Sequence, residues 1–365
     1  MRSDRDWSGP RVLDPDDSGD LAEWLRLWSD WPEREVQAHP GYGRLFLSDA
    51  SERLACLAWQ GAEGAVLYPF ILRDLSAAQW WSPGEGPTFD IVTPYGYGGP
   101  YLLHADDPKA LARRFWPELD RWAVRQGVVS EFVRFSLFRE ALLDYPGETE
   151  QKLLNVVRDL RPDPEALWMD FEHKVRKNVK KARRSDVRVE VDPAGARIED
   201  FLRIYRQTLD RRGADPGYYF SPEFFASLHR VLPEQFAYFH AIAGSRVVST
   251  ELVLLSASTA YSLLGGTDQD AFELRPNDLL KFEIMLWLRQ RGFARFVLGG
   301  GYEPDDGIFR YKASFAPGST LPFVVGKRVL LPDLYERLVD SRRQNERKLG
   351  REWSPKLGYF PEYRG

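Results

Sequence analysis

Cysteine is almost missing from this chain of 365 residues, since Cys56 is the only one. A single cysteine permits no internal disulfide and no cysteine metal cluster. Its place in the apolar string RLACLAWQ predicts a small buried side chain. We expect no bound metal, because the histidines also lack the spacing of metal ligands. These are His39, His104, His173, His229 and His240, of which His240 lies in an apolar string and is expected in a core.

Long apolar runs and two common catalytic motifs are missing as well. No run of about 18 apolar residues occurs, which excludes a typical transmembrane helix. The first residues, MRSDRDWSGPRVLDPDDSGD, are charged and interrupted by proline, unlike a secretory leader. The chain contains neither a G-x-S-x-G nor a G-x-x-x-x-G-K-[ST] string, so hydrolase and P-loop functions have no support. We expect a soluble, cytoplasmic protein without a transmembrane segment.

Positive charge is not in excess, because the net charge is -4 and the pI is about 5.9. Any contact with nucleic acid must therefore come from a local basic patch. Hydrophobic residues make up 43% and aromatic residues 14%, enough for packed cores. At about 150 residues per domain, the length predicts roughly two domains.

The pattern of helices and strands repeats along the chain. In the first half we expect helices at 20–31, capped by Asp20, and at 107–126. Strands are expected there at 43–49, 53–60, 64–75, 128–138 and 152–160. The second half shows a strand, two helices, three strands, a helix and a strand. These segments are 187–191, 198–213, 221–232, 236–267, 277–292 and 294–300. The order predicts a duplicated α/β (α+β) domain, with domains at 1–165 and 166–365 and the final helix free to pack on the first domain.

The second half resembles the Fem family of aminoacyltransferases, in its order of elements and in its motifs. The matching strings are FLRIYRQTLDRRG, FAYFHAIAGSRVVSTELVLL, AYSLLGGTDQDAFELRPNDLLKFEIMLWLRQRGFARFVLGGG and GIFRYKASF, within about 170–330. VLYPFILR and TPYGYGGP carry a weaker likeness in the first half. The resemblance implies two tandem domains of the Gcn5-related N-acyltransferase (GNAT) type, each a mixed, mostly antiparallel sheet flanked by helices.

The resemblance also implies an activity, namely amide bond formation. An amino acid moves from aminoacyl-tRNA, the cosubstrate, to an amine on a cell-wall precursor or natural-product intermediate; no other cofactor is implied. Members from cocci carry a long helical hairpin in the second domain, where this chain has only a short helix at 170–185. Two other readings stay open: an N-acyltransferase using acyl-CoA (such as acetyl-CoA) or a carrier thioester, and a non-catalytic protein of the same fold that binds RNA or a phosphorylated ligand.

Lys312 is the first candidate for catalysis. In the family, the lysine after the glycine turn lies at the reaction centre, where its ammonium would stabilise an oxyanion. We expect an extended segment at 309–312 that places Arg310 and Lys312 on one face and Phe309 and Tyr311 on the other. A solvated strand edge is the alternative. The preceding loop adds substrate-binding candidates that either meet the incoming amine or only form a turn: Tyr302, Glu303, Asp305 and, next to them, Asp306.

Arg211 is the candidate for an acceptor phosphate. The string TLDRRG resembles the family's T-x-x-R, and a guanidinium fork suits two phosphate oxygens. Arg212 is the adjacent alternative, and a cation that only complements the helix dipole is another. In TPYGYGGPYLL, Tyr95 and Tyr97 lie among glycines, either as ligand contacts or as turn packing.

The helix at 170–185 concentrates positive charge in an otherwise acidic protein. Phe171, Val175, Val179 and Ala182 form a narrow apolar stripe along it. The candidate RNA contacts occupy much of the remaining surface: Arg176, Lys177, Lys180, Lys181 and Arg184, with Arg183 beside them. We expect a docking face for RNA phosphates, with a merely solvated face as the alternative. The segment offers no aromatic side chain for stacking on bases, so sequence-specific reading is not expected.

The sequence also bears on whether the acyl donor is coenzyme A. An acetyl-CoA enzyme of this superfamily needs [RQ]-x-x-G-x-[GA] at the start of a helix, where backbone N–H groups bind the pyrophosphate. RQRGFA (289–294) has these letters but stands at the end of a predicted helix, where the dipole repels anions. The expected loop position reads GGTDQDAFELRPNDLL, which is acidic. This pattern argues against ordinary CoA use.

Overall fold

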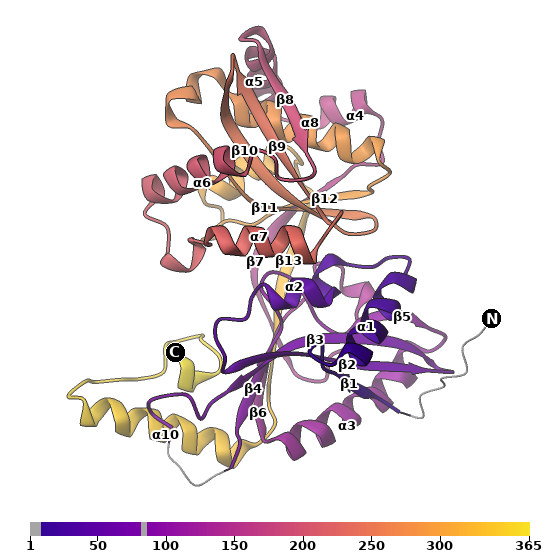
Figure 1. Ribbon diagram of the computed structural model, residues 1–365, viewed down its shortest axis with the longest axis vertical. Helices are drawn as coiled ribbons and strands as arrows, with labels where there is room; N and C mark the ends of the chain where they lie inside the picture. Colours follow the sequence, from indigo (N-terminus) through magenta and orange to yellow (C-terminus); the bar gives the residue numbers. More distant parts are fainter. Residues whose placement is uncertain (1–8, 82–85) are drawn as a thin grey trace. The chain divides into compact units, whose positions relative to one another are not determined.

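The computed structural model describes residues 9–81 and 86–365, and the chain divides into two compact units. The first unit contains the residues up to Lys152 together with Phe323–Gly365, and the second contains Leu153–Pro322. The chain leaves the first unit along β7 (Glu148–Asp159) and returns along β13 (Thr320–Val329) (Figure 1). This differs from a single cut at 165/166, because β13 pairs with β6 (Val128–Arg134) and α10 (Pro332–Lys348) packs on β6.

The first unit is a sheet with the strand order β1-β2-β3-β4-β6-β13, in which β5 adds to β3. Its elements up to β6 are β1 (Arg11–Leu13), α1 (Ser18–Asp30), α2 (Pro40–Arg44), β2 (Glu52–Gly61), β3 (Gly64–Asp74), β4 (Phe89–Val92), β5 (Tyr101–Ala105) and α3 (Pro108–Gln126).

The second unit has the strand order β8-β9-β10-β11-β12-β7. Its other elements are α4 (Pro164–Asp170), α5 (His173–Arg184), β8 (Val187–Asp192), α6 (Ile198–Arg212), α7 (Pro222–Val231), β9 (Phe236–Ala243), β10 (Arg246–Leu255), β11 (Thr259–Thr267), α8 (Pro276–Gln290), β12 (Arg295–Gly299) and α9 (Gly307–Ala313).

The two units repeat one topology. Each runs through a strand, two helices and three strands, to which the first unit adds β5, before a helix crosses to a parallel strand. The parallel pairs are β4·β6 and β11·β12, and the other pairs within each unit's sheet are antiparallel. A parallel pair needs such a crossover, which α3 and α8 supply. The predicted duplication of a mixed α/β domain is therefore confirmed.

Two local predictions in the first half are wrong. Residues 43–49 form the end of α2 and a turn rather than a strand, because Pro40 starts a short helix whose Gly41 N–H is capped by His39 Nδ1 at 3.0 Å. The cap of α1 is Asp17, whose carboxylate accepts the N–H groups of Gly19 and Asp20 at 2.9 Å. The side chain of Asp20 pairs with Arg11 instead.

Strand alternation distributes the core of the second unit over two faces of its sheet. On β9, Tyr238 contacts the ring of Phe201 on α6, whereas its neighbour Phe239 contacts Trp287 on α8. Successive side chains of a strand point to opposite faces. Helices α6 and α7 therefore lie on one face and α8 with α5 on the other (Figure 1). In the described residues, no helix is long and apolar enough to cross a membrane.

Candidate functional site

The triple glycine after β12 makes room for a lysine and a carboxylate. Gly299 has φ +85°, and a Cβ there would lie 3.1 Å from Lys312 Nζ. The Gly300 carbonyl accepts a hydrogen bond from Lys312 Nζ at 2.7 Å. A Cβ on Gly301 would lie 2.3 Å from the Asp306 carboxylate. Gly299 and Gly301 thus let the backbone approach charged side chains that a larger residue would displace.

The segment after the glycines is helical, which corrects the extended segment predicted at 309–312. Asp306 is the N-cap of α9, and its carboxylate accepts the N–H groups of Phe309 and Tyr302 at 2.7 Å. In a helix, residues two apart point in different directions, so Arg310 and Lys312 do not share a face. The exposed Arg310 donates to the Asp305 carbonyl, whereas Lys312 reaches back to the glycine turn.

The ammonium of Lys312 lies in a poorly solvated place. The side chain is half-buried, and burial together with the charge of the nearby Lys281 lowers its pKa to about 8. Glu251 and Asp306 act in the opposite direction. A desolvated cation interacts more strongly with a developing negative charge than a solvated one. This is the strongest candidate for a reaction centre among the described residues of the second unit.

Beside Lys312 lies a buried charged group that the sequence analysis missed. Lys281 on α8 donates to the Glu251 carboxylate on β10 and to Ser262 Oγ on β11, the latter at 3.0 Å. Lys281 and Glu251 are both buried. The sequence does indicate this pair, because a glutamate stands inside the apolar string VVSTELVLL and a lysine inside LLKFEIM. A charge in such a string is rarely buried without a partner.

The other predicted residues near Lys312 divide into packing and exposed groups. Tyr311 is packed edge-on against Phe315, and burial raises its pKa well above the ordinary value. Phe309 is half-buried and packs against the hydrophobic core of the second unit, to which Phe315 belongs. Tyr302, Glu303 and Asp305 are exposed, with the Tyr302 ring 5.9 Å from that of Tyr218.

Arg211 stands in the last turn of α6, where it was predicted. Its guanidinium lies 5.0 Å from the Phe272 ring, and it donates to Thr208 Oγ1 over 3.4 Å. A Cβ on Gly266 of β11 would lie 2.3 Å from the same Thr208 oxygen, so this glycine lets α6 pack closely on the sheet. Arg211 and its neighbour Arg212 are both exposed. Either exposed guanidinium can receive a phosphate, and the choice between them stays a prediction.

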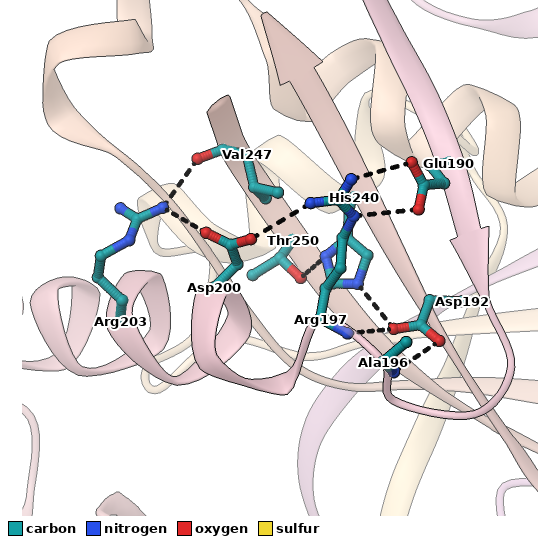
Figure 2. Close-up of polar contacts among 9 residues, drawn as sticks. All are labelled: Glu190, Asp192, Ala196, Arg197, Asp200, Arg203, His240, Val247 and Thr250. Atoms are coloured by element: carbon teal, nitrogen blue, oxygen red, sulfur yellow. Dashed lines mark hydrogen bonds and ion pairs between the residues drawn. The ribbon is translucent and has the colours of Figure 1, made fainter. Parts of the chain in front are cut away.

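A buried polar network holds the other end of α6 (Figure 2). His240 is fully buried, with Nδ1 2.9 Å from Thr250 Oγ1 and Nε2 3.5 Å from the Asp192 carboxylate. Asp192 accepts the backbone N–H groups of Ala196 and Arg197 at the start of α6. Burial lowers the pKa of His240, which keeps the ring neutral at neutral pH. The predicted core position of His240 is confirmed, and the network connects β8, β9 and β10 to α6.

The basic helix is α5, and its apolar stripe is buried as predicted. Val175, Val179 and Ala182 are fully buried. Some of its basic side chains have partners within the protein. Arg176 donates to the carbonyls of Met169 and Phe171, and Lys181 pairs with Glu273.

The other predicted cations of α5 lie at the surface, and two of them lie beside aromatic rings from neighbouring helices. Lys177, Lys180 and Arg184 are exposed. Lys180 Nζ lies 5.8 Å from the Trp168 ring of α4. Arg183, which pairs with Glu283, lies 5.2 Å from the Phe282 ring of α8.

The half-buried Trp168 provides an aromatic surface that the sequence of α5 lacks, and it packs on the buried Phe282, whose ring lies 5.1 Å away. Both residues line a shallow pocket of about 400 Å³ together with Lys180, Arg183 and the acidic Glu165. A flat ring between cations suits stacking on an unpaired base. The expectation concerned the basic segment alone, and the aromatic side chain beside it, Trp168, comes from α4.

Tyr95 and Tyr97 belong to the first unit, and Lys312 belongs to the second. Tyr42 donates its hydroxyl to the Tyr95 carbonyl at 2.8 Å, and the half-buried Tyr97 ring contacts Phe323. In the described residues, no three His, Cys, Asp or Glu side chains are arranged to hold a metal ion.

The start of α8 does not offer a site for an anion. Pro276 removes one N–H group, the cap residue Arg275 makes no side-chain cap, and the buried Asp278 stands in the first turn. The short helix before it, Gln269–Leu274, carries Asp270 and Glu273. RQRGFA lies at the end of α8, as the sequence predicted. Negative side chains at a helix N-terminus compete with a bound phosphate.

Comparison with known proteins agrees with this architecture. Residues 169–313 match the family model of the acetyltransferase (GNAT) domain, a range that includes Arg211 and Lys312. No curated protein sequence matches the chain.

Among solved structures, FemX is 13% identical, with a TM-score of 0.59 over 87% of this chain and 97% of that one. The C-terminal domain of a putative lysylphosphatidylglycerol synthetase from Agrobacterium fabrum is 15% identical, with a TM-score of 0.51 over 87% and 96%. A conserved protein of unknown function from Bacteroides thetaiotaomicron is 11% identical, with a TM-score of 0.52 over 84% and 97%. The chain therefore has a Fem-like fold of the GNAT type, as the motifs predicted.

Proposed function

We propose that this chain is a Fem-like aminoacyltransferase. It transfers an amino acid from aminoacyl-tRNA to the amine of a cell-wall precursor or natural-product intermediate in the cytoplasm. One observation carries the proposal: a GNAT-type unit places the desolvated ammonium of Lys312 on the Gly300 carbonyl, beside the buried Lys281–Glu251 pair. Such a preorganised cation suits an acyl transfer that develops negative charge on oxygen.

The reaction needs no covalent intermediate with the protein. The acceptor nitrogen attacks the ester carbonyl carbon, a C–N bond forms, and the carbonyl electron pair moves to oxygen. Lys312 stabilises this oxyanion. The electron pair then returns, the C–O bond to the tRNA ribose breaks, and the ribose oxygen takes a proton while the new amide nitrogen loses one. Arg211 binds an acceptor phosphate, for which its exposed guanidinium is suited.

Two features favour tRNA over CoA as donor. The acidic, proline-containing start of α8 lacks the N–H ladder that would bind a pyrophosphate. The α5 face, with the half-buried Trp168 next to its cations, offers phosphate contacts together with a stacking surface. A CoA or carrier-thioester donor is the second candidate, because the family model matched by 169–313 is that of an acetyltransferase domain.

A transfer assay with three donors in parallel tests the proposal. Charged tRNA, acetyl-CoA and free amino acid are each offered with a panel of amine acceptors, with and without RNase. We expect transfer from charged tRNA that RNase abolishes. RNase-insensitive transfer from acetyl-CoA would reject the tRNA donor, and no transfer from any donor would favour a non-catalytic binding protein.

A further inference from the structure

The first unit contains a pocket that the proposed chemistry does not use. It has a volume of about 270 Å³ and lies at the ends of β4 and β6, between β13 and the C-terminal segment around Tyr359 and Phe360. All of its lining residues belong to the first unit. Its size suits a small molecule rather than a chain of residues.

Positive charge at this pocket exceeds the negative charge that the described contacts supply. The buried Asp90 carboxylate contacts two guanidinium groups, Arg73 and Arg364, each at 2.6 Å. Glu150 likewise contacts two ammonium groups, those of Lys152 and Lys327. Arg73 and Lys152 line the pocket themselves. Arg73 and Lys152 therefore each share their carboxylate with a second cation.

Arg134, on the pocket wall, is a further cation in excess. Its guanidinium donates to the Thr93 carbonyl at 3.1 Å and lies 5.2 Å from the Phe132 ring, but among the described residues it pairs with no carboxylate. Burial lowers its pKa, and the neighbouring Arg73 lowers it further. A guanidinium stays charged in proteins, so a half-buried one without a counter-ion strongly favours an anionic ligand.

Aromatic rings form the rest of the wall. Phe132, Phe323, Tyr359 and Phe360 line the pocket, and the rings of Phe132 and Phe360 lie 6.3 Å apart. A ligand with a flat apolar part would bury that part against these rings. The excess of cations favours a dianion such as a phosphate monoester over a monoanionic carboxylate.

We propose that this pocket binds a small phosphorylated compound with a flat ring, its phosphate on Arg134, Arg73 and Lys152 and its ring against Phe132 and Phe360. This site is separate from Lys312 and does not depend on the acyl transfer proposed above. The phosphate oxygens replace the missing counter-ions, and the ring replaces water on the aromatic wall. Free nucleotides and aryl phosphates both combine a phosphate with a flat ring.

Equilibrium binding to the full chain tests the site without any transfer reaction. Phenyl phosphate, inorganic phosphate and benzoate are titrated separately by calorimetry and by saturation-transfer NMR. We expect phenyl phosphate to bind at least about fivefold more tightly than either part probe, because only it offers both the dianion and the ring. Its affinity should fall between pH 7.5 and pH 5, where the phosphate takes up its second proton, at a pKa of about 6.

Variants separate this site from general loss of structure. Arg134→Met should weaken phenyl phosphate binding at least about tenfold. Lys152→Met, at a more exposed position, should weaken phenyl phosphate binding less than Arg134→Met. It tests the site independently if Arg134→Met fails to fold. Arg139→Met is the matched control, because Arg139 is also a half-buried guanidinium over a ring, that of Phe135, but does not line the pocket.

Three results would overturn the proposal. They are no saturable binding of phenyl phosphate at millimolar concentration, equal binding of benzoate, and an equal loss of binding in the Arg139→Met control. A protein that fails to bind phenyl phosphate but still transfers an amino acid would leave the acyl transfer intact and remove only this site.

Discussion

Each of the two repeated units holds a different cation near the end of the strand that follows its crossover helix. In each unit a helix crosses between two parallel strands. In the first unit, Arg134 ends the second of these strands, β6. In the second unit, Lys312 comes after β12 in the sequence, and its ammonium binds the Gly300 carbonyl just past the end of that strand. A guanidinium keeps its charge in any environment, whereas a desolvated ammonium can lose its proton near neutral pH. The comparison indicates that one copy of the fold is suited to holding an anion and the other to acyl-transfer chemistry.

The two units also differ in the number of side chains that bind a buried glutamate. Glu131 of the first unit accepts from Tyr68 at 2.7 Å, from Tyr145 at 3.0 Å and from Arg328 at 2.7 Å. For Glu251 of the second unit the described side-chain partner is Lys281. The first carboxylate accepts from three side-chain donors, while the second depends on one ammonium that also acts on Lys312.

The largest expected effect comes from breaking the pair in the second unit. Lys281→Met leaves the Glu251 charge buried, which should lower the free energy of unfolding by about 3–5 kcal/mol. The double variant with Glu251→Leu should recover most of this loss, because no unpaired charge is left. Urea unfolding measures both, and the exposed Lys109→Met is the control. A double variant as unstable as the single one would show that the ion pair is not the cause.

Lys312→Met should lower the rate of transfer by about 10²–10³-fold, the usual cost of removing a group that stabilises an oxyanion. Steady-state kinetics with charged tRNA measure the rate, and circular dichroism checks the fold. Lys109→Met should keep the full rate. If Lys312→Met keeps the full rate as well, Lys312 is not at the reaction centre.

The same substitution should make the protein more stable. The folded-state pKa of Lys312, about 8, lies below its ordinary value of 10.5, so the folded protein holds this proton less tightly than the unfolded chain. The charge therefore destabilises the fold below pH 8, and the cost disappears as pH rises toward 10.5. Lys312→Met should add about 1–3 kcal/mol at pH 7. The gain should shrink between pH 8 and pH 10.5 and vanish above it, and a gain independent of pH would contradict the burial of this charge.

Lys312→Arg tests the difference between the two cations directly. In the natural protein the transfer rate should fall on the alkaline side as Lys312 loses its proton around pH 8. A guanidinium does not titrate there, so the remaining activity of Lys312→Arg should lack this fall. The pH profile of kcat decides the matter. An unchanged alkaline limb in the variant would assign the limb to another group.

The smallest effect concerns the α5 face. The combined change Lys177→Gln and Arg184→Gln should weaken tRNA binding and reduce the slope of log K against log salt by about 2, one for each phosphate contact. Filter binding between 50 and 200 mM salt measures this slope, with Arg188→Gln on the exposed edge of β8 as the control. If the double variant has the same slope as the natural protein, these two residues make no phosphate contacts.

The sequence by itself determined most of the elements, the duplicated order and the general place of the reactive residues. Periodicity, caps such as Ser221 and the glycine after α6 act within a few residues, so they are readable without contacts. Only the tertiary structure decided what happens after the glycine turn. There Asp306 caps a helix against the alternating pattern of 309–312, because a local hydrogen bond outweighs a short periodicity.

Tertiary structure also decided which side chains meet. Lys281 and Glu251 are 30 residues apart, and Trp168 reaches the α5 face from α4. Residues 323–365 return to the first unit because β13 completes its sheet, a pairing that joins β6 to a strand almost 200 positions later. Long-range pairing depends on packing and burial over the whole fold, and no local pattern records it.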